Sequence, residues 1–128
     1  MIYLKRVYAE AMATDGYRVL IDRLWPRGVK KEMAKIDYWA KELTPSTDLR
    51  KWYHQFPEQR SEFARRYQRE LIALPEAQHL LHDLAERSHG ETITFVYAAK
   101  DQVNNHGVIL MEWIASRFKG EVDLSTNQ

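Results

Sequence analysis

Apolar residues along the chain fall into short continuous runs and into longer stripes at helical spacing. Phe63, Tyr67, Leu71 and Leu74 lie at i, i+4, i+8 and i+11 and predict the buried face of one helix. The β-branched and aromatic runs predict strands, at residues 2–8, 17–21 and 92–98. Strands that alternate with helices predict an α/β fold, with a small, mostly parallel sheet of about four strands and helices packed on it.

Proline and small polar residues predict where the helices begin. Any of residues 46–48 can cap a helix behind Pro45. Pro57 suits the first turn of the helix that carries Phe63, and Pro75 suits the first turn of the next helix. The 63–71 stripe and its successor are therefore expected to form two separate helices.

Two segments have a less clear pattern. Residues 29–36 have helix propensity and predict one short helix. Residues 37–43 have helix propensity too, but their bulky side chains alternate and Pro45 disfavours a helix just before it. These two features favour a short strand over 37–43. A last helix is expected from the apolar positions between Val108 and Phe118.

The composition is that of an ordinary globular protein, with 45% hydrophobic and 29% charged residues. At 128 residues, positions 1–128 are predicted to form a single domain, with a polar tail at 125–128 that is expected to fray. The absence of cysteine suits the cytoplasm. Neither a signal peptide nor a membrane span is predicted, so we expect a cytoplasmic protein without membrane contact.

The stretch Asp22-Arg23-Leu24-Trp25-Pro26-Arg27-Gly28 follows the buried 17–21 strand and has the densest chemistry in the chain. Arg23 and Arg27 carry planar, permanently charged groups that suit a carboxylate or a phosphate. Gly28 allows a backbone amide to approach a ligand closely. The alternative is structural: the aspartate pairs with an arginine, and Trp25 plugs the end of the sheet.

A second candidate loop follows the last predicted strand. Lys100 and Asp101 come first, and Asn104-Asn105-His106-Gly107 then opens a helix. One asparagine can cap that helix, and the small glycine leaves room for an anion at its positive end. The helix dipole favours a neutral His106, which could act as a general acid or base beside Asp101. The alternative is a routine cap with a hydrogen-bonded surface histidine.

Ligands of parallel α/β sheets bind beyond the carboxyl ends of the strands. Three loops are expected at that edge, at residues 22–28, 44–46 and 100–106. Further side chains could reach a ligand there, namely Lys41, Ser46, Arg50, Tyr97 and Asn105. For Ser46 we favour a helix cap over a nucleophile, because no base is predicted beside it.

Several kinds of site are not predicted. His79 and His82 have no third ligand in view, so we expect no metal site. The chain lacks a glycine-rich dinucleotide motif and a P-loop, and no cofactor is expected. The net charge of +1, from 19 basic and 18 acidic residues, argues against nucleic-acid binding. The sequence gives no prediction of the oligomeric state.

Four segments carry a specific pattern in order along the chain, at residues 18–28, 39–53, 63–71 and 96–106. Together they resemble the YeaO-like family of uncharacterised small bacterial proteins, domain-of-unknown-function family 488. The resemblance covers nearly the whole chain, and the Asp-Arg-Leu-Trp-Pro-Arg-Gly piece is its most specific part. It implies a compact α/β domain in the cytoplasm, and it implies no activity. Gly107 stands where the family often has alanine.

We therefore predict a cleft that binds a small anionic ligand, phosphate- or nucleotide-like, with or without turnover. Arg23, Arg27 and Lys100 would clamp the anion. The acid/base candidates would be Asp22, Asp101 and His106, and the stacking walls would be Trp25 and Tyr97. The alternative is a non-enzymatic module that senses a ligand or docks a partner through the same cleft. Nucleic-acid binding is a weaker third reading.

Overall fold

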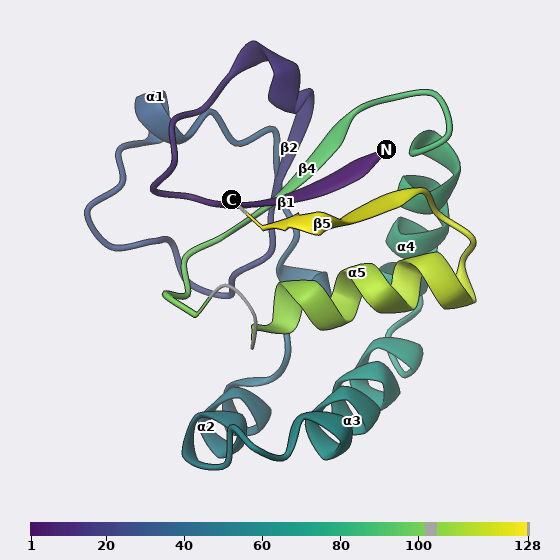
Figure 1. Cartoon of the computed structure of the whole chain (residues 1–128). Helices are drawn as coiled ribbons and strands as arrows, with labels where there is room; N and C mark the ends of the chain where they lie inside the picture. The colour runs from purple at the N-terminus through teal and green to yellow at the C-terminus, as the bar shows by residue number, and fades with distance from the viewer. Residues whose placement is uncertain (102–104, 128) are drawn as a thin grey trace.

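In the part of the chain that the structure describes, five strands form one parallel sheet. The computed structural model describes residues 1–101 and 105–127. The strands are β1 (Ile2–Arg6), β2 (Tyr17–Leu20), β3 (Tyr38–Trp39), β4 (Ile93–Tyr97) and β5 (Val122–Asn127). Their order is β3-β2-β4-β1-β5, and all neighbouring pairs are parallel (Figure 1). The predicted α/β fold is confirmed, with one more strand than expected.

The described helices lie between these strands. They are α1 (Lys31–Ala34), α2 (Thr47–Gln55), α3 (Arg60–Ile72), α4 (Pro75–Arg87) and α5 (His106–Arg117), with short 3-10 helices η1 (Ala13–Asp15) and η2 (Lys41–Leu43). Two predicted helix starts are confirmed. The Ser46 hydroxyl accepts a hydrogen bond from the Leu49 amide at 3.1 Å and caps α2. Pro75 is the first residue of α4.

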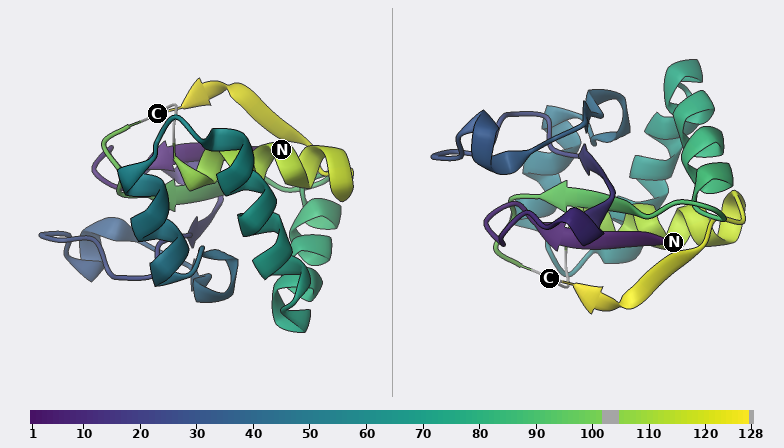
Figure 2. Two further views of the ribbon diagram at one scale, coloured as in Figure 1. Left: turned by 90° about the horizontal axis from the view of Figure 1, so that it is seen from below. Right: turned by 90° about the horizontal axis from the view of Figure 1, so that it is seen from above.

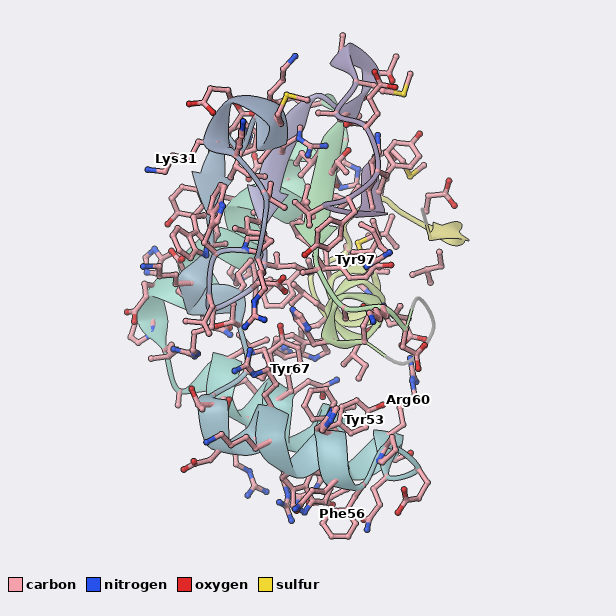
Figure 3. All side chains as sticks on the ribbon, turned by 90° about the vertical axis from the view of Figure 1, so that its left-hand side faces the viewer. Lys31, Tyr53, Phe56, Arg60, Tyr67 and Tyr97 are labelled. Carbon is pink, nitrogen blue, oxygen red and sulfur yellow. The ribbon has the colours of Figure 1, made fainter. Side chains whose placement is uncertain are left out.

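Helices α2 to α5 enclose a large core on one face of the sheet. Phe63, Tyr67 and Leu71 of the predicted stripe are buried in it, whereas Leu74 is 37% exposed and lies between α3 and α4. Tyr53 of α2 stacks on Phe63 with ring centroids 4.0 Å apart. Figure 3 shows Tyr53 and Tyr67 turned inward between the helices and the sheet. β4 is buried along its whole length, as a strand with a neighbour on both sides should be.

The chain between β2 and β3 covers the opposite face of the sheet. A smaller core forms there from Val7, Leu20 and Val96, with Trp25, Val29, Ile36, Trp39 and Ala98 packed against it. Arg18 donates from Nε to the Ala34 carbonyl at 2.9 Å, which holds α1 to this side. Figure 2 shows the loop that carries α1 projecting from one side of the domain, away from α4.

Two predicted boundaries are wrong. Pro57 lies before α3 rather than in its first turn, because the Gln59 amide donates to the Phe56 carbonyl at 2.9 Å and closes a turn first. The strand expected over 37–43 is reduced to β3, and the chain then turns into η2. In residues 41–43, helix propensity outweighs the alternating pattern.

The pattern of the chain does not predict β5. An edge strand has a neighbour on one side only, and β5 pairs with β1 alone. Such a strand needs no continuous apolar run, so the polar sequence of 122–127 gave no signal for it. Residues 125–127 of the predicted tail lie in this strand, and Gln128 lies outside the described residues.

A buried charge cluster ties β1 and β2 to the turn between them. Lys5 Nζ lies 3.0 Å from Asp15 Oδ1, and Arg18 Nη1 lies 2.7 Å from Asp15 Oδ2. All three residues are buried. Burial raises the pKa of Asp15, but the hydrogen bond from the Met12 amide, the contacts of Lys5 and the bond from Arg18 outweigh it. The net pKa is below the ordinary 3.8, so folding favours the charged carboxylate.

Asp15→Asn should lower the free energy of unfolding at neutral pH by about 3–5 kcal/mol, because two buried cations lose their counter-charge. Since the folded pKa is lowered, the contribution of Asp15 is present above the unfolded pKa and is lost as the pH falls through the folded value. The gap between wild type and variant should therefore shrink below the ordinary value of 3.8. Urea unfolding across pH measures both effects.

The matched control is Asp83→Asn, because Asp83 is mostly exposed and lies 3.5 Å from Arg87. This variant should change stability by less than about 0.5 kcal/mol. A gap for Asp15→Asn that does not change with pH would contradict the proposed role of its charge.

Candidate functional site

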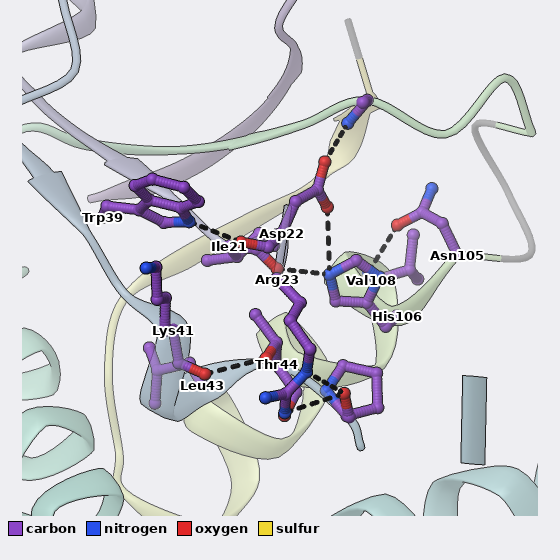
Figure 4. A network of polar contacts seen from close by, with 12 residues as sticks. Ile21, Asp22, Arg23, Trp39, Lys41, Leu43, Thr44, Asn105, His106 and Val108 are labelled. Carbon is purple, nitrogen blue, oxygen red and sulfur yellow. Dashed lines mark hydrogen bonds and ion pairs between the residues drawn. The ribbon is translucent and has the colours of Figure 1, made fainter. Parts of the chain in front are cut away.

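The loops after β2 and β4 meet the start of α5 at the carboxyl edge of the sheet, as the topology predicts. The Asp22 carboxylate follows β2, and its Oδ2 accepts a hydrogen bond from the Ala98 amide at 2.8 Å. His106, the first residue of α5, places Nε2 2.7 Å from the Ile21 carbonyl oxygen and 3.6 Å from Asp22 Oδ1 (Figure 4). Asp22 and His106 are thus brought together.

The contact to Ile21 fixes the role of the His106 ring. A carbonyl oxygen can only accept a hydrogen bond, so Nε2 must carry the proton in this contact. The side chains of Asp22 and His106 are only 16% and 13% exposed. His106 therefore acts here as a donor that joins α5 to the end of β2.

Burial raises the pKa of Asp22. The charge of His106, the hydrogen bond from the Ala98 amide and the charge of Arg50 oppose this effect, and the net pKa is still above 3.8. Tyr67 is fully buried, and burial raises the pKa of its hydroxyl, with further contributions from Glu70 and Asp22. The surroundings of the Asp22 carboxyl and the Tyr67 hydroxyl therefore disfavour the charged forms of these two groups.

Arg23 is not a free anion clamp. Its Nε and Nη2 lie 3.3 and 3.2 Å from the Pro45 carbonyl oxygen, and Nη2 is 3.5 Å from that of Thr44. The guanidinium therefore ties the loop after β2 to the residues before α2. It satisfies backbone carbonyls where a ligand anion was expected.

Trp25 is not a stacking wall either. Its Nε1 donates to the Val29 carbonyl at 2.7 Å, and its ring lies edge-on to Trp39 with centroids 5.5 Å apart. Trp39 in turn donates from Nε1 to the Asp22 carbonyl at 2.6 Å, and Lys41 Nζ lies 4.1 Å from the Trp39 ring centroid. The structural alternative, a tryptophan that plugs the end of the sheet, describes Trp25.

Tyr97 and Arg27 differ in burial, and neither has the role predicted for it. Tyr97 is fully buried in the large core, so its ring cannot wall an open site. Arg27 is exposed, and its carbonyl accepts a hydrogen bond from the Tyr8 hydroxyl at 3.0 Å. Gly28 adopts φ 77°, a conformation that favours glycine, so the backbone of the turn accounts for a glycine at this position.

Ser46 and Asn105 are helix caps. Besides accepting from Leu49, the Ser46 hydroxyl donates to Glu70 Oε2 at 2.6 Å. Asn105 Oδ1 accepts from the Val108 amide at 3.2 Å and caps α5. Asn104, the other candidate cap, lies outside the described residues. Capping, the favoured role for Ser46, is confirmed.

The remaining candidates are exposed charges near this edge. Lys41, Arg50 and Lys100 are exposed. Within residues 1–101 and 105–127, no hydrogen bond or ion pair is seen for the side chains of Arg50 and Lys100. Asp101 is exposed, and its charge raises the pKa of Tyr53 and of Tyr97, which places it near both rings.

Tyr67 and Glu70 belong to the site but were not predicted there. Tyr67 donates a hydrogen bond from its hydroxyl to the Leu43 carbonyl, and its ring centroid lies 6.3 Å from that of His106. The sequence assigned Tyr67 to the core stripe, because spacing alone does not show what a tyrosine hydroxyl contacts. In the described residues, no group of three acidic or histidine side chains is arranged to hold a metal ion.

A protein-family model described as the inactive DUF488-N3 subclade matches residues 1–128. The chain belongs to this family. It is 42% identical to the uncharacterised protein YeaO of Escherichia coli over 115 residues, 90% of this chain and 97% of that protein. It is 39% identical to the uncharacterised protein Rv3073c of Mycobacterium tuberculosis over 119 residues, 91% of this chain and 95% of that protein.

No solved structure matches the chain significantly. None of the helices in the described residues is long and apolar enough to cross a membrane. The resemblance to the YeaO-like family is confirmed by the family match, and the family name itself assigns no reaction.

The bond from His106 to Ile21 predicts a slowly exchanging ring proton on Nε2. In nitrogen-15 NMR spectra the neutral His106 ring should be the Nε2–H tautomer, with a visible proton on that nitrogen. The control is His79, which is exposed on α4 and whose ring proton should exchange too fast to be seen. A Nδ1–H tautomer at His106 would contradict this geometry.

Proposed function

We propose that this protein is a non-enzymatic binding module that holds a small anionic ligand, phosphate- or nucleotide-like, at the carboxyl edge of its sheet. One observation carries the choice of a binding module over an enzyme. Two of the three acid/base candidates bond to the chain's own backbone at this edge, Asp22 to the Ala98 amide and His106 to the Ile21 carbonyl.

These contacts leave little for proton transfer. A general acid or base must reach the proton that it moves in a substrate, and His106 Nε2 already donates to a carbonyl. Asp22 accepts a hydrogen bond from the Ala98 amide through Oδ2, and its Oδ1 lies 3.6 Å from His106 Nε2. The description of the family as an inactive subclade favours the same reading. Turnover of the ligand is therefore the less supported of the two hypotheses.

The anion would be held by exposed cations around the edge rather than by the arginines of the loop after β2. Arg50 is exposed one turn into α2, and its charge lowers the pKa of Asp22, which places it within electrostatic range of the pair. Lys100 follows β4 at the same edge, and Lys41 lies over Trp39. Arginine can bind a phosphate through two parallel hydrogen bonds, which makes Arg50 the principal contact.

The alternative is a module that docks a partner through the same edge, because exposed cations suit an acidic partner as well as a small anion. Nucleic-acid binding is less favoured, since the net charge of the chain is only +1. A cytoplasmic location stays a prediction.

Arg50→Ala should weaken binding of a small anion about tenfold, because a charge-assisted hydrogen bond is lost. The probes are inorganic phosphate, pyrophosphate and nucleoside monophosphates, screened by thermal shift and measured by calorimetry. The matched control is Arg65→Ala, because Arg65 is exposed on α3 and pairs with Glu62. It should bind the same probe as tightly as wild type.

Phosphorus NMR of the bound probe separates binding from turnover. We expect the ligand to stay unchanged over a long incubation with the protein. Conversion of the ligand would overturn the non-enzymatic assignment, and equal affinities of Arg50→Ala and wild type would overturn the site.

A further inference from the structure

The segment between β2 and β3 concentrates positive charge on one part of the surface. Residues 23–35 contain five of the 19 basic residues and one of the 18 acidic residues, while the remaining 14 basic and 17 acidic residues leave the rest of the chain negative. Four of these cations are exposed, namely Arg27, Lys30, Lys31 and Lys35. We call these four residues and the chain between them the basic loop.

The cations of the basic loop differ in their partners from several cations on the helices. Arg65 and Arg66 on α3 bind Glu62, and Arg87 on α4 binds Asp83 and Glu91. Among the described residues, the side chains of the basic loop cations make no hydrogen bond or ion pair. Their charge is therefore available to an external partner.

Apolar side chains stand beside these charges. Leu24, just before the basic loop, is 66% exposed, and Met33 within it is 69% exposed. They are the two most exposed large hydrophobic residues of the described chain. Exposed apolar groups that form a patch rimmed by polar residues mark protein-interaction sites, and Leu24 and Met33 would supply the apolar part of such a surface.

The backbone of the basic loop is fixed by hydrogen bonds from three side chains. Trp25 donates to the Val29 carbonyl, Tyr8 to the Arg27 carbonyl and Arg18 to the Ala34 carbonyl. Trp25, Val29 and Ile36 pack in the smaller core. A partner would therefore meet a surface that is already formed, and binding would cost little ordering of the chain.

Lys35 is held in an unfavourable backbone conformation. It ends α1 with φ 50° and ψ 46°, the left-handed region that a glycine adopts without strain. A lysine here keeps a charge on the surface at the expense of local strain. Strained residues cluster at functional positions.

We propose that the basic loop docks an acidic protein segment that also carries apolar side chains. The four unpaired cations complement its carboxylates, and Leu24 and Met33 meet its apolar groups. Figure 3 shows Lys31 pointing outward, far from Tyr53 and Tyr67 in the large core.

Two other anionic partners fit less well. Single-stranded nucleic acid needs several free aromatic faces for stacking. The rings of Trp25 and Trp39 pack on each other and in the smaller core, and the exposed Tyr8 ring already has the Arg6 guanidinium 5.1 Å from its centroid. Glu32 lies between Lys31 and Met33 and is exposed. A uniformly anionic surface, such as a phospholipid membrane, would repel this carboxylate, whereas a protein can place a donor opposite it.

The test measures the affinity of this protein for several labelled probes by fluorescence anisotropy. The probes are a peptide of glutamates interspersed with leucines, a polyglutamate peptide of equal charge and a single-stranded RNA, and vesicles containing phosphatidylserine are tested by co-sedimentation. We expect the glutamate–leucine peptide to bind most tightly. The triple variant Lys30→Gln, Lys31→Gln, Lys35→Gln should weaken it about tenfold.

The matched control removes the same charge elsewhere, with Lys51→Gln, Arg69→Gln and Arg117→Gln, all at exposed positions. It should leave peptide affinity within about twofold of wild type. Leu24→Ser with Met33→Gln should abolish the preference for the glutamate–leucine peptide over polyglutamate. Equal effects of the two charge triples, or tighter binding of RNA or vesicles than of peptide, would overturn the proposal.

Lys35→Gly separates docking from folding. Glycine relieves the left-handed strain, so the variant should have a melting temperature equal to or above that of wild type. It should nevertheless bind the peptide more weakly, because one cation is lost. Unchanged peptide affinity in a folded Lys35→Gly protein would remove Lys35 from the docking surface and count against the proposal.

Discussion

The hydrogen bonds that the loop after β2 makes to backbone groups hold the carboxyl edge of the sheet together. The Asp22 carboxylate accepts from the Ala98 amide, and the Asp22 carbonyl accepts from Trp39. The Ile21 carbonyl accepts from His106. Where central strands end inside a fold, their backbone groups lose the ladder and need other partners. These side chains supply them, and so β2, β3, β4 and α5 keep one arrangement.

This constraint explains why residues that look like a catalytic set need not be one. An arginine offers five donors, which suit two backbone carbonyls as well as they suit a phosphate. Arg23 uses them on Thr44 and Pro45. The cations that stay unpaired in the described residues, such as Arg50 and Lys31, lie outside this set of contacts. The two proposed surfaces are built from such cations.

The sequence was sufficient for the parts of the fold that depend on periodicity. The β-branched run of β4 and the apolar stripe of α3 are both buried as expected, and the parallel topology brings Asp22 and His106 to one edge. It was not sufficient for β5, because an edge strand with polar residues has no distinctive pattern. It also could not show where Trp25 and Arg23 point, since residue type does not determine side-chain direction.

The most direct test of this account is the stability of Arg23→Ala. Loss of the Arg23 guanidinium leaves the Pro45 carbonyl at this edge without its hydrogen-bond partner. The free energy of unfolding, measured in urea, should therefore decrease by about 1–3 kcal/mol. Arg65→Ala, at an exposed pair on α3, is the control and should change stability by less than about 1 kcal/mol. If Arg23→Ala is as stable as wild type, the loop after β2 does not hold the edge together, and the structural assignment of its residues is contradicted.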